Sequence, residues 1–191
     1  MKRLPDDLAE KLLAASNQFT GTGLDISVDD VAQLTDVPRA TLYYYFGGKD
    51  DLVAFYLNDK LARVGDAVEK AATGEGSVRH RLEASLNAVL HALAEHPVLC
   101  VELPAAVKQS GDYQEVMMAA DRVVLTPLRK LLEEGRATGD LEVADPQTTA
   151  IALMGALNMV GMMQVVSTGA IDAAGTAPTL VPELINGLVR R

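Results

Sequence analysis

Apolar positions recur every three to four residues along most of the chain, which is the period of an amphipathic helix. The first example lies between residues 4 and 19, where Leu8, Leu12, Ala15 and Phe19 share one stripe. Alternating runs of β-branched residues bounded by turns, which would indicate strands, are missing. The pattern therefore predicts an all-α protein.

Glycine and proline divide this pattern into segments. Gly21 and Gly23 end the first helix, and Gly47-Gly48 precede a long helix that we expect over 49–72. Further helices are expected at 78–96, 98–110, 113–137, 146–167 and 178–190, with a loop between 167 and 178. This division predicts about nine helices in two parts, a small N-terminal domain at 1–48 and a larger helical domain at 49–191.

Residues 27–46 have the pattern of a short helix, a three-residue turn and a second short helix. Ser27 is a good N-cap, and two acids follow it in the first turn, where the helix dipole favours them. Asp36 suits a tight turn because aspartate tolerates a left-handed backbone, and Pro38 suits the first position of the next helix. The spacing is that of a helix-turn-helix, although many helical hairpins share it.

The charge of the chain opposes a nucleic-acid partner. The net charge is −9, and residues 1–52 carry five basic against nine acidic side chains. Non-specific affinity for DNA grows with the number of phosphates that basic groups neutralise. Any DNA-binding role must therefore depend on a few well-placed cations, and tight non-specific binding is not expected.

The run ISVDDVAQLTDVPRATLYYYFGGKDDLV, at 26–53, resembles the DNA-binding segment of the tetracycline-repressor (TetR/AcrR) family of bacterial regulators. One departure is Asp36, at a turn position where the family usually has glycine. The resemblance implies a three-helix DNA-binding domain followed by a ligand-binding and dimerisation domain. The matching residues are Ser27, Val31-Ala32, Val37, Thr41-Leu42-Tyr43, Phe46, Lys49 and Leu52.

Half of the eight aromatic residues lie in the run 43–46, at the end of the expected recognition helix. Helical spacing turns Leu42 and Phe46 inward, so Tyr43 and the N-terminal residues of this helix face outward. Tyr44 and Tyr45 are expected at the edge of this surface, although all four rings could instead pack a small core. The predicted DNA contacts are Ser27, Arg39, Ala40, Thr41, Tyr43, Tyr44, Tyr45 and Lys49.

These residue types are suited to two kinds of contact with DNA, to base edges and to phosphates. Arg39 can pair bidentately with the O6 and N7 atoms of guanine, and Ala40 allows a close approach and contact with a thymine methyl. Thr41 and the tyrosine hydroxyls suit phosphate oxygens, which fix register without reading sequence. Lys49 adds charge and backbone N–H groups at the start of the next helix.

The uncharged stretch 146–171 is long enough for a membrane span. Its acidic flanks, Asp145 and Asp172, argue against one, because spans prefer basic flanks. A helix that is apolar all round also needs cover on two sides. The family resemblance supplies the second side, since its last two helices form a four-helix dimer interface; the expected interface residues are Leu153, Leu157, Gly161, Leu180, Leu184 and Leu188.

Helices 78–96, 98–110, 113–137 and 146–167 are expected to enclose a ligand pocket. Methionine is frequent there, and flexible thioethers line adaptable pockets as well as ordinary cores. Few charges occur in these stretches, which favours an apolar or weakly polar effector. The expected lining residues are Leu86, Leu90, Val101, Met117, Met154 and Asn158.

Other chemistry is sparse. The three histidines do not combine with Cys100 at a metal-ligand spacing, and no nucleophile motif or phosphate loop is present. We therefore predict no catalytic residues, no metal and no cofactor. A single cysteine excludes an internal disulfide, and no apolar leader follows Met1, which together favour the cytoplasm.

The sequence thus predicts a homodimeric transcriptional repressor that leaves a palindromic, double-stranded operator when a small apolar ligand binds. Two alternatives stay open. One is a carrier or enzyme that uses the helical cavity without DNA, and the other is a TetR-like regulator without an effector.

Overall fold

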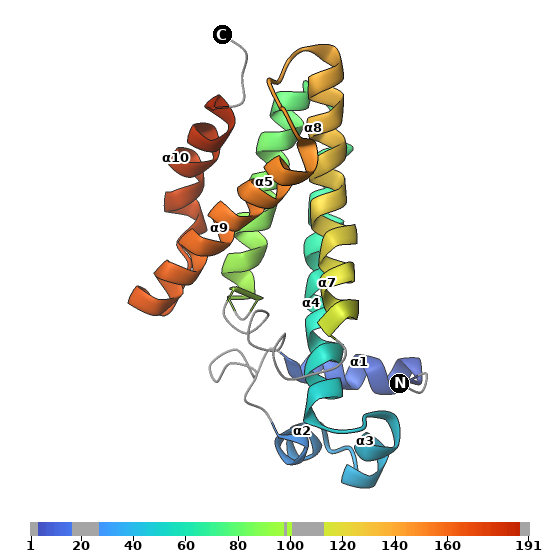
Figure 1. Ribbon diagram of the computed structural model, residues 1–191. Helices are drawn as coiled ribbons and strands as arrows, with labels where there is room; N and C mark the ends of the chain where they lie inside the picture. The colour runs from blue at the N-terminus through green and yellow to red at the C-terminus, as the bar shows by residue number, and fades with distance from the viewer. Residues whose placement is uncertain (1–3, 17–26, 98, 101–112, 188–191) are drawn as a thin grey trace.

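The computed structural model describes residues 4–16, 27–97, 99–100 and 113–187. Every regular element in these ranges is helical, which confirms the all-α prediction (Figure 1). The elements are α1 (Asp6–Ala15), α2 (Val28–Thr35), α3 (Arg39–Tyr45), α4 (Lys49–Ala72), α5 (Val78–Glu95), α7 (Tyr113–Ala120), the π-helical η2 (Asp121–Leu125), α8 (Thr126–Thr138), α9 (Pro146–Thr168) and α10 (Ala173–Asn186).

The long helix α4 joins the two parts of the molecule. In Figure 1, α1, α2 and α3 gather around one end of α4, and the helix continues into the larger bundle. The Tyr56 hydroxyl of α4 donates a hydrogen bond to the Leu12 carbonyl of α1 at 3.2 Å. Phe55 of α4 makes an edge contact with Phe46, with ring centroids 5.5 Å apart. The small domain is thus fixed to α4 by polar and aromatic contacts.

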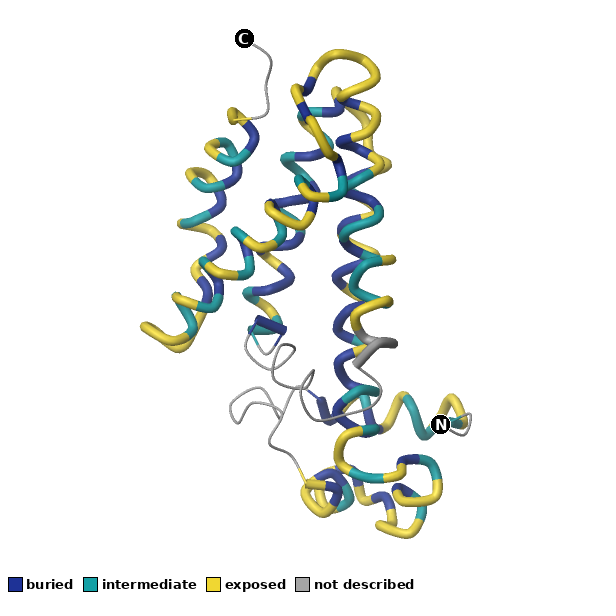
Figure 2. The backbone as a smooth tube through the Cα atoms, in the orientation of Figure 1, coloured by how far each residue is buried: buried dark blue, intermediate teal, exposed yellow. Residues whose placement is uncertain are grey.

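The larger domain is built around α5. This helix packs against α4, α8, α9 and α10, and its leucines 82, 86, 90 and 93 are buried in the core (Figure 2). A helix contacted on so many sides can bury apolar residues around most of its circumference. The α4–α5 pair therefore forms the centre of the protomer.

Gly65 allows α4 to approach η2 closely. A Cβ atom added at Gly65 would lie 2.6 Å from Val123 Cβ, which is far inside van der Waals contact. From sequence alone, this glycine is equally compatible with an easily bent helix and with close packing. The structure favours close packing, because no side chain larger than hydrogen fits between α4 and Val123.

The last helix begins earlier than its prolines suggest. The expected loop over 167–178 is a short turn, and α10 begins at Ala173 and contains Pro178 and Pro182. Asp172 sets this start, because its side chain accepts a hydrogen bond from the Gly175 N–H at 2.9 Å. The prediction that this helix begins at residue 178 is therefore wrong. Of the expected helix 98–110, only Leu99 and Cys100 lie within the described residues.

The buried side of α9 differs from the expected one. Leu153, Leu157 and Gly161 pack inside the protomer, and a Cβ on Gly161 would lie 3.0 Å from Ile171 Cδ1 and 3.2 Å from Cys100 Sγ. Residues that are buried inside one protomer cannot also form the surface of a dimer. The prediction that these three lie in the dimer interface is therefore corrected. The side of α9 that faces away from the core carries exposed large apolar residues at Ile151, Met159, Met163 and Val166.

The length and composition of α9 would let it cross a membrane, and 22% of its most apolar window is buried in the protomer. Its other residues are half-buried or exposed, and the large apolar side chains among the exposed ones are Ile151, Met159, Met163 and Val166.

We predict that Gly65→Ala destabilises the protein. Overpacking strain of about 1–3 kcal/mol should exceed the ~0.5–1 kcal/mol by which alanine favours a helix interior over glycine. Thermal unfolding measures the difference. Gly187→Ala is the control, because only the Leu184 carbonyl, at 3.7 Å, lies near its added Cβ. Equal melting temperatures for the two variants would contradict the close approach of α4 and η2.

Candidate nucleic-acid interface and ligand pockets

The first helix of the motif, α2, begins at a reciprocal cap. The Asp30 N–H donates to Ser27 Oγ at 3.1 Å, and Asp30 Oδ2 accepts from the Ser27 N–H at 2.9 Å and from its hydroxyl at 2.6 Å. These hydrogen bonds from the Ser27 side chain and backbone hold the pKa of Asp30 below its usual range. Ser27, predicted as a DNA contact, is exposed, and its hydroxyl is engaged in the cap.

The turn between α2 and α3 depends on Asp36. Its φ of 52° and ψ of 35° place it in the left-handed region, as its residue type predicts. The following Val37 is buried beneath the turn. This geometry directs the chain from α2 into α3, with Pro38 as the residue that precedes the new helix. Aspartate here adopts the backbone conformation that glycine would adopt most easily.

The recognition helix α3 has two distinct sides. Leu42 and the adjoining Phe46 are buried in the core, whereas Tyr43 and Tyr44 are 56% and 60% exposed. Tyr45 is half-buried against the core and meets the Tyr44 ring edge-on at a centroid distance of 4.9 Å. The run 43–46 is therefore divided between core and surface as predicted. Arg39 and Ala40 are exposed at the start of α3, and Thr41 is partly exposed.

The sequence reasoning did not anticipate an acid next to Arg39. Asp29 Oδ1 of α2 lies 2.7 Å from Arg39 Nε, and both side chains are more than half exposed. An ion pair of this kind contributes little to stability. It does hold the guanidinium of Arg39 beside α2 through its Nε atom. No local signal shows this pair, since the partners lie ten residues apart on different helices.

Lys49 begins α4 next to this surface. It is exposed, and Asp50 and Asp51 follow it in the first turn. Asp51 Oδ2 accepts a hydrogen bond from the Gly47 N–H at 2.6 Å, which fixes the junction between α3 and α4. The predicted contact residues from 39 to 49 thus lie on α3 and on the first residue of α4.

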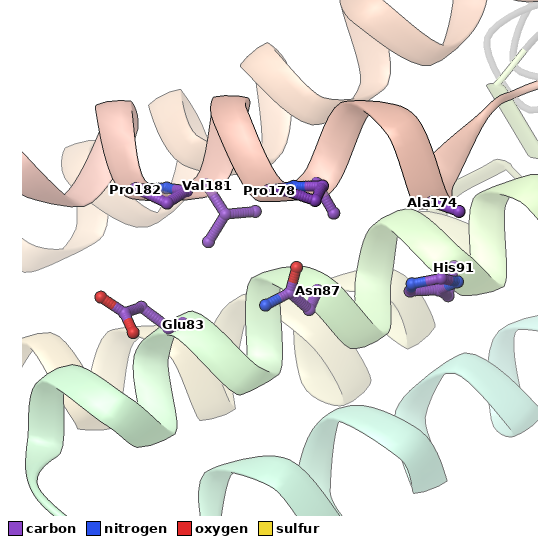
Figure 3. A pocket seen from close by; sticks show the side chains of 8 residues that line it. Glu83, Asn87, His91, Ala174, Pro178, Val181 and Pro182 are labelled. Carbon is purple, nitrogen blue, oxygen red and sulfur yellow. The ribbon is translucent and has the colours of Figure 1, made fainter.

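Two pockets are lined by described residues of the larger domain. One, of about 260 Å³, lies between α5 and α10, where Asn87 and His91 face Pro178 and Ala174 (Figure 3). The other, of about 450 Å³, lies between α4 and the α7–η2 segment; its lining residues are Asn58, Leu61, Ala62, Met118, Ala119, Arg122 and Val123.

Neither of these two pockets is lined by a residue predicted for the ligand site. Leu86 and Leu90 are fully buried core residues, Met154 and Asn158 are half-buried on α9, and Met117 is exposed on α7. The assignment of these residues to a ligand site stays a prediction, and Leu86 and Leu90 pack in the core of α5. Val101 lies outside the described residues.

The described part of the chain offers little metal-binding or reactive chemistry. Within the described ranges, no group of three or more His, Cys, Asp or Glu side chains could hold a metal ion. Cys100 is fully buried, and burial raises the pKa of its thiol to about 11. Its sulfur packs against Gly161, where an added Cβ atom would lie 3.2 Å from Cys100 Sγ, so Cys100 fills space in the core.

Two family models match the chain. Residues 12–54 match the model described as "Bacterial regulatory proteins, tetR family", and residues 75–162 match "Tetracyclin repressor-like, C-terminal domain". Both describe parts of one family, and together they match more than half of the sequence. The chain belongs to the TetR family. It is accordingly a DNA-binding transcriptional regulator of the helix-turn-helix type.

Relatives of this TetR-family chain support the same conclusion. It is 24% identical over 184 residues to the HTH-type transcriptional regulator EthR of Mycolicibacterium smegmatis, which covers 92% of this chain and 81% of EthR. The fold is similar to that of the fatty acid degradation regulator FadR from Bacillus halodurans, with a TM-score of 0.78, 22% identity and coverage of 99% and 100%. It also matches FadR from Bacillus subtilis, solved with stearoyl-CoA, with a TM-score of 0.75, 17% identity and coverage of 93% and 98%.

We predict that Asp29→Asn tightens DNA binding by up to about fivefold, corresponding to the ~0.2–1 kcal/mol typical of an exposed ion pair. The substitution releases Arg39 and removes a negative charge beside the recognition helix. Fluorescence anisotropy with operator DNA measures the change, and Asp66→Asn, on the exposed side of α4, is the control. Weaker binding with loss of base preference would mean that Asp29 orients Arg39 instead of restraining it.

Proposed function

We propose that this chain is a homodimeric repressor that binds a palindromic operator and releases it when an apolar or amphipathic effector binds. Residues 1–48 serve as the DNA-binding domain, and residues 49–191 bind the effector and the second subunit. The observation that carries the proposal is α3, which buries Leu42 and keeps Arg39, Ala40 and Tyr43 exposed. In a helix-turn-helix protein, the N-terminal part of this helix meets base edges in the major groove.

The DNA contacts fall into two groups. Arg39 reads a guanine, and Ala40 sits close to the bases. Thr41, Tyr43, Tyr44 and Lys49 contact phosphates, with Ser27 and Tyr45 at the margin of the surface. The acidic side chains around these residues keep affinity for random DNA low, because few phosphates are neutralised. Selectivity then depends on a small number of direct contacts.

The second subunit is proposed to cover the open side of α9. This side presents Ile151, Gly155, Met159, Met163 and Val166. A continuous exposed apolar surface of this kind indicates an interaction site in a soluble protein. Leu180 and Leu184 of α10 are half-buried and adjoin the core, so they can contribute at its margin. Leu188 belongs to the predicted interface and lies outside the described residues. Two copies related by a two-fold axis would bury this surface twice.

The effector is proposed to act through α4. This helix carries the DNA-binding domain and packs in the centre of the larger domain. A ligand that favours one position of α4 changes the spacing of the two recognition helices, and a tenfold loss of operator affinity requires about 1.4 kcal/mol of differential binding. FadR of Bacillus subtilis, similar in fold, was solved with stearoyl-CoA, which supports an acyl compound as the class to test first. We infer no catalysis, since the effector only shifts an equilibrium.

The proposal predicts different outcomes at two cationic positions. Arg39→Ala should cost about 1–3 kcal/mol at one base pair of each half-site and relax the preference there. Lys49→Ala should weaken binding to all sequences equally and flatten the salt dependence. Binding to a selected operator and its single-base variants, at two salt concentrations, separates the effects. A uniform loss across the variants for Arg39→Ala would show that Arg39 reads no base.

Charge on the open side of α9 should prevent assembly. Met159→Glu places a carboxylate where the second subunit is proposed to pack, and burying an unpaired charge is strongly unfavourable. Light scattering is expected to show helical monomers that bind a full operator poorly. Met118→Glu is the control, because Met118 is similarly exposed on α7. A Met159→Glu dimer, or a wild type that is monomeric at micromolar concentration, would refute this interface.

A further inference from the structure

A polar stripe on α5 faces α10 across the smaller of the two pockets. Glu83, Asn87 and His91 are spaced four residues apart, so they lie on one side of α5. With residues of α10 they line a cavity of about 260 Å³, and Figure 3 shows the Asn87 side chain pointing toward α10. None of the described residues that line this cavity is a lysine or an arginine, so the Glu83 carboxylate makes this wall negative.

The opposite wall is a proline-containing side of α10. Pro178 and Pro182 lie inside this helix, and both line the cavity. Proline has no backbone N–H, so the carbonyls of Ala174 and Pro178, four residues earlier, lose the intrahelical donor that a helix normally supplies. Each such carbonyl points along the helix toward the residue four positions later, and Ala174, Pro178 and Pro182 all line the cavity. The wall therefore offers carbonyl oxygens next to apolar proline rings.

Polar contacts hold α10 at both of its ends. Arg79 of α5 donates a hydrogen bond to the Asn186 side chain, at the last residue of α10, at 2.9 Å. At the start of α10, Gln164 of α9 donates to the Thr176 hydroxyl at 2.7 Å and accepts from the Asp172 N–H at 2.9 Å. The cavity thus lies between walls that are already held in place, which lowers the entropic cost of binding a ligand.

The cavity carries more hydrogen-bond acceptors than donors. Glu83 Oε1 accepts from Arg79 Nε at 3.0 Å, and an ionised carboxylate has about four acceptor sites on its two oxygens, so it can accept from a ligand as well. The two carbonyls of α10 accept only. The Asn87 amide both donates and accepts, as does a neutral imidazole at His91. A ligand that donates hydrogen bonds and carries a positive charge therefore suits this cavity.

We propose that the α5–α10 cavity binds a small organic cation, an alkylammonium or arylalkylammonium. An ammonium group has three N–H donors and no acceptor, which matches a negative wall that is rich in acceptors. The apolar part of the ligand packs on Pro178, Val181 and Pro182. Cavities for drug-sized ligands are about 300–1,000 Å³, so about 260 Å³ suits a smaller molecule with one charged group. An anion would be repelled by Glu83.

The site goes beyond the proposed function. None of the described residues that line it belongs to α4, the helix that carries the DNA-binding domain. A cation bound here contacts α5 and α10 and stabilises the folded protein, so its binding is measurable without DNA.

Titration calorimetry with phenethylammonium tests the site, and 2-phenylethanol provides the same apolar body without the charge. We expect wild type to bind the ammonium at least about tenfold more tightly than the alcohol. Glu83→Gln should weaken ammonium binding about tenfold and leave alcohol binding unchanged, because it removes the charge that the ammonium pairs with. Glu95→Gln is the control, since Glu95 is an exposed glutamate of the same helix that does not line the cavity, and it should bind both compounds as wild type does.

The prolines provide a second test that leaves the carboxylate in place. Pro178→Ala restores an N–H, which bonds to the Ala174 carbonyl inside the helix. We expect a higher melting temperature, because alanine favours a helix interior, and a lower ratio of ammonium affinity to alcohol affinity, because that carbonyl is now occupied. Thr179→Ala is the control, since it raises helix propensity at an exposed position of α10 outside the cavity, and it should leave the ratio unchanged.

Wild type that binds the ammonium no more tightly than the alcohol would overturn the proposal, as would tighter binding of 3-phenylpropanoate than of the ammonium. Arg79→Gln, which removes the ion-pair partner of Glu83, should bind the ammonium at least as tightly as wild type. Equal weakening by Arg79→Gln and Glu83→Gln would show that their ion pair only shapes the cavity, and would overturn the proposal too. If circular dichroism shows that Glu83→Gln is unfolded, Pro178→Ala decides, and an unchanged affinity ratio there contradicts the site.

Discussion

The structure depends on the continuous packing of α4 through one hydrophobic core that reaches from α1 to α10. Over 24 residues this helix contributes buried side chains from Leu52, beside the helix-turn-helix, to Ala72, beside α5. It is held closely at two points, by Gly65 against Val123 and by the hydrogen bond of Tyr56 to α1. Close-packed interiors do not deform gradually, so a shift at one end of such a helix is transmitted to the other. The family's division into a DNA-reading part and a ligand-sensing part therefore has a physical connection in this chain.

The DNA-binding surface is notable for its acidity. Asp29 holds the guanidinium that is proposed to read a base, Asp30 completes a helix cap, and Asp50 and Asp51 follow Lys49. Asp29, Asp30 and Asp51 each have a local role in pairing or capping, and all four acids weaken attraction to the phosphate backbone. Such a surface binds random DNA weakly. It discriminates between DNA sequences, because binding is favourable only where the direct contacts are also satisfied.

The sequence predicted the DNA-binding motif well because local chemistry determines it. Ser27 caps its helix, Asp36 adopts the left-handed turn, and Leu42 and Phe46 are inward at helical spacing. The side of α9 that is buried could not be predicted, because Leu153 and Met159 are both apolar and the helix has no charged residue to mark its outer side. The burial of Lys60 could not be predicted either. It reads as a surface charge beside Asp59, and only tertiary packing shows that it is buried.

The central claim is that two copies of α3 read two half-sites of one operator. Hydroxyl-radical footprinting on an operator selected from random or genomic DNA tests it most directly. The account predicts two equivalent protected patches, related by the symmetry of the site and centred about 10–10.5 base pairs apart, roughly 34–36 Å, or a multiple of that spacing. Effector should remove both patches together. A single protected patch, or two patches without symmetry, would contradict the account.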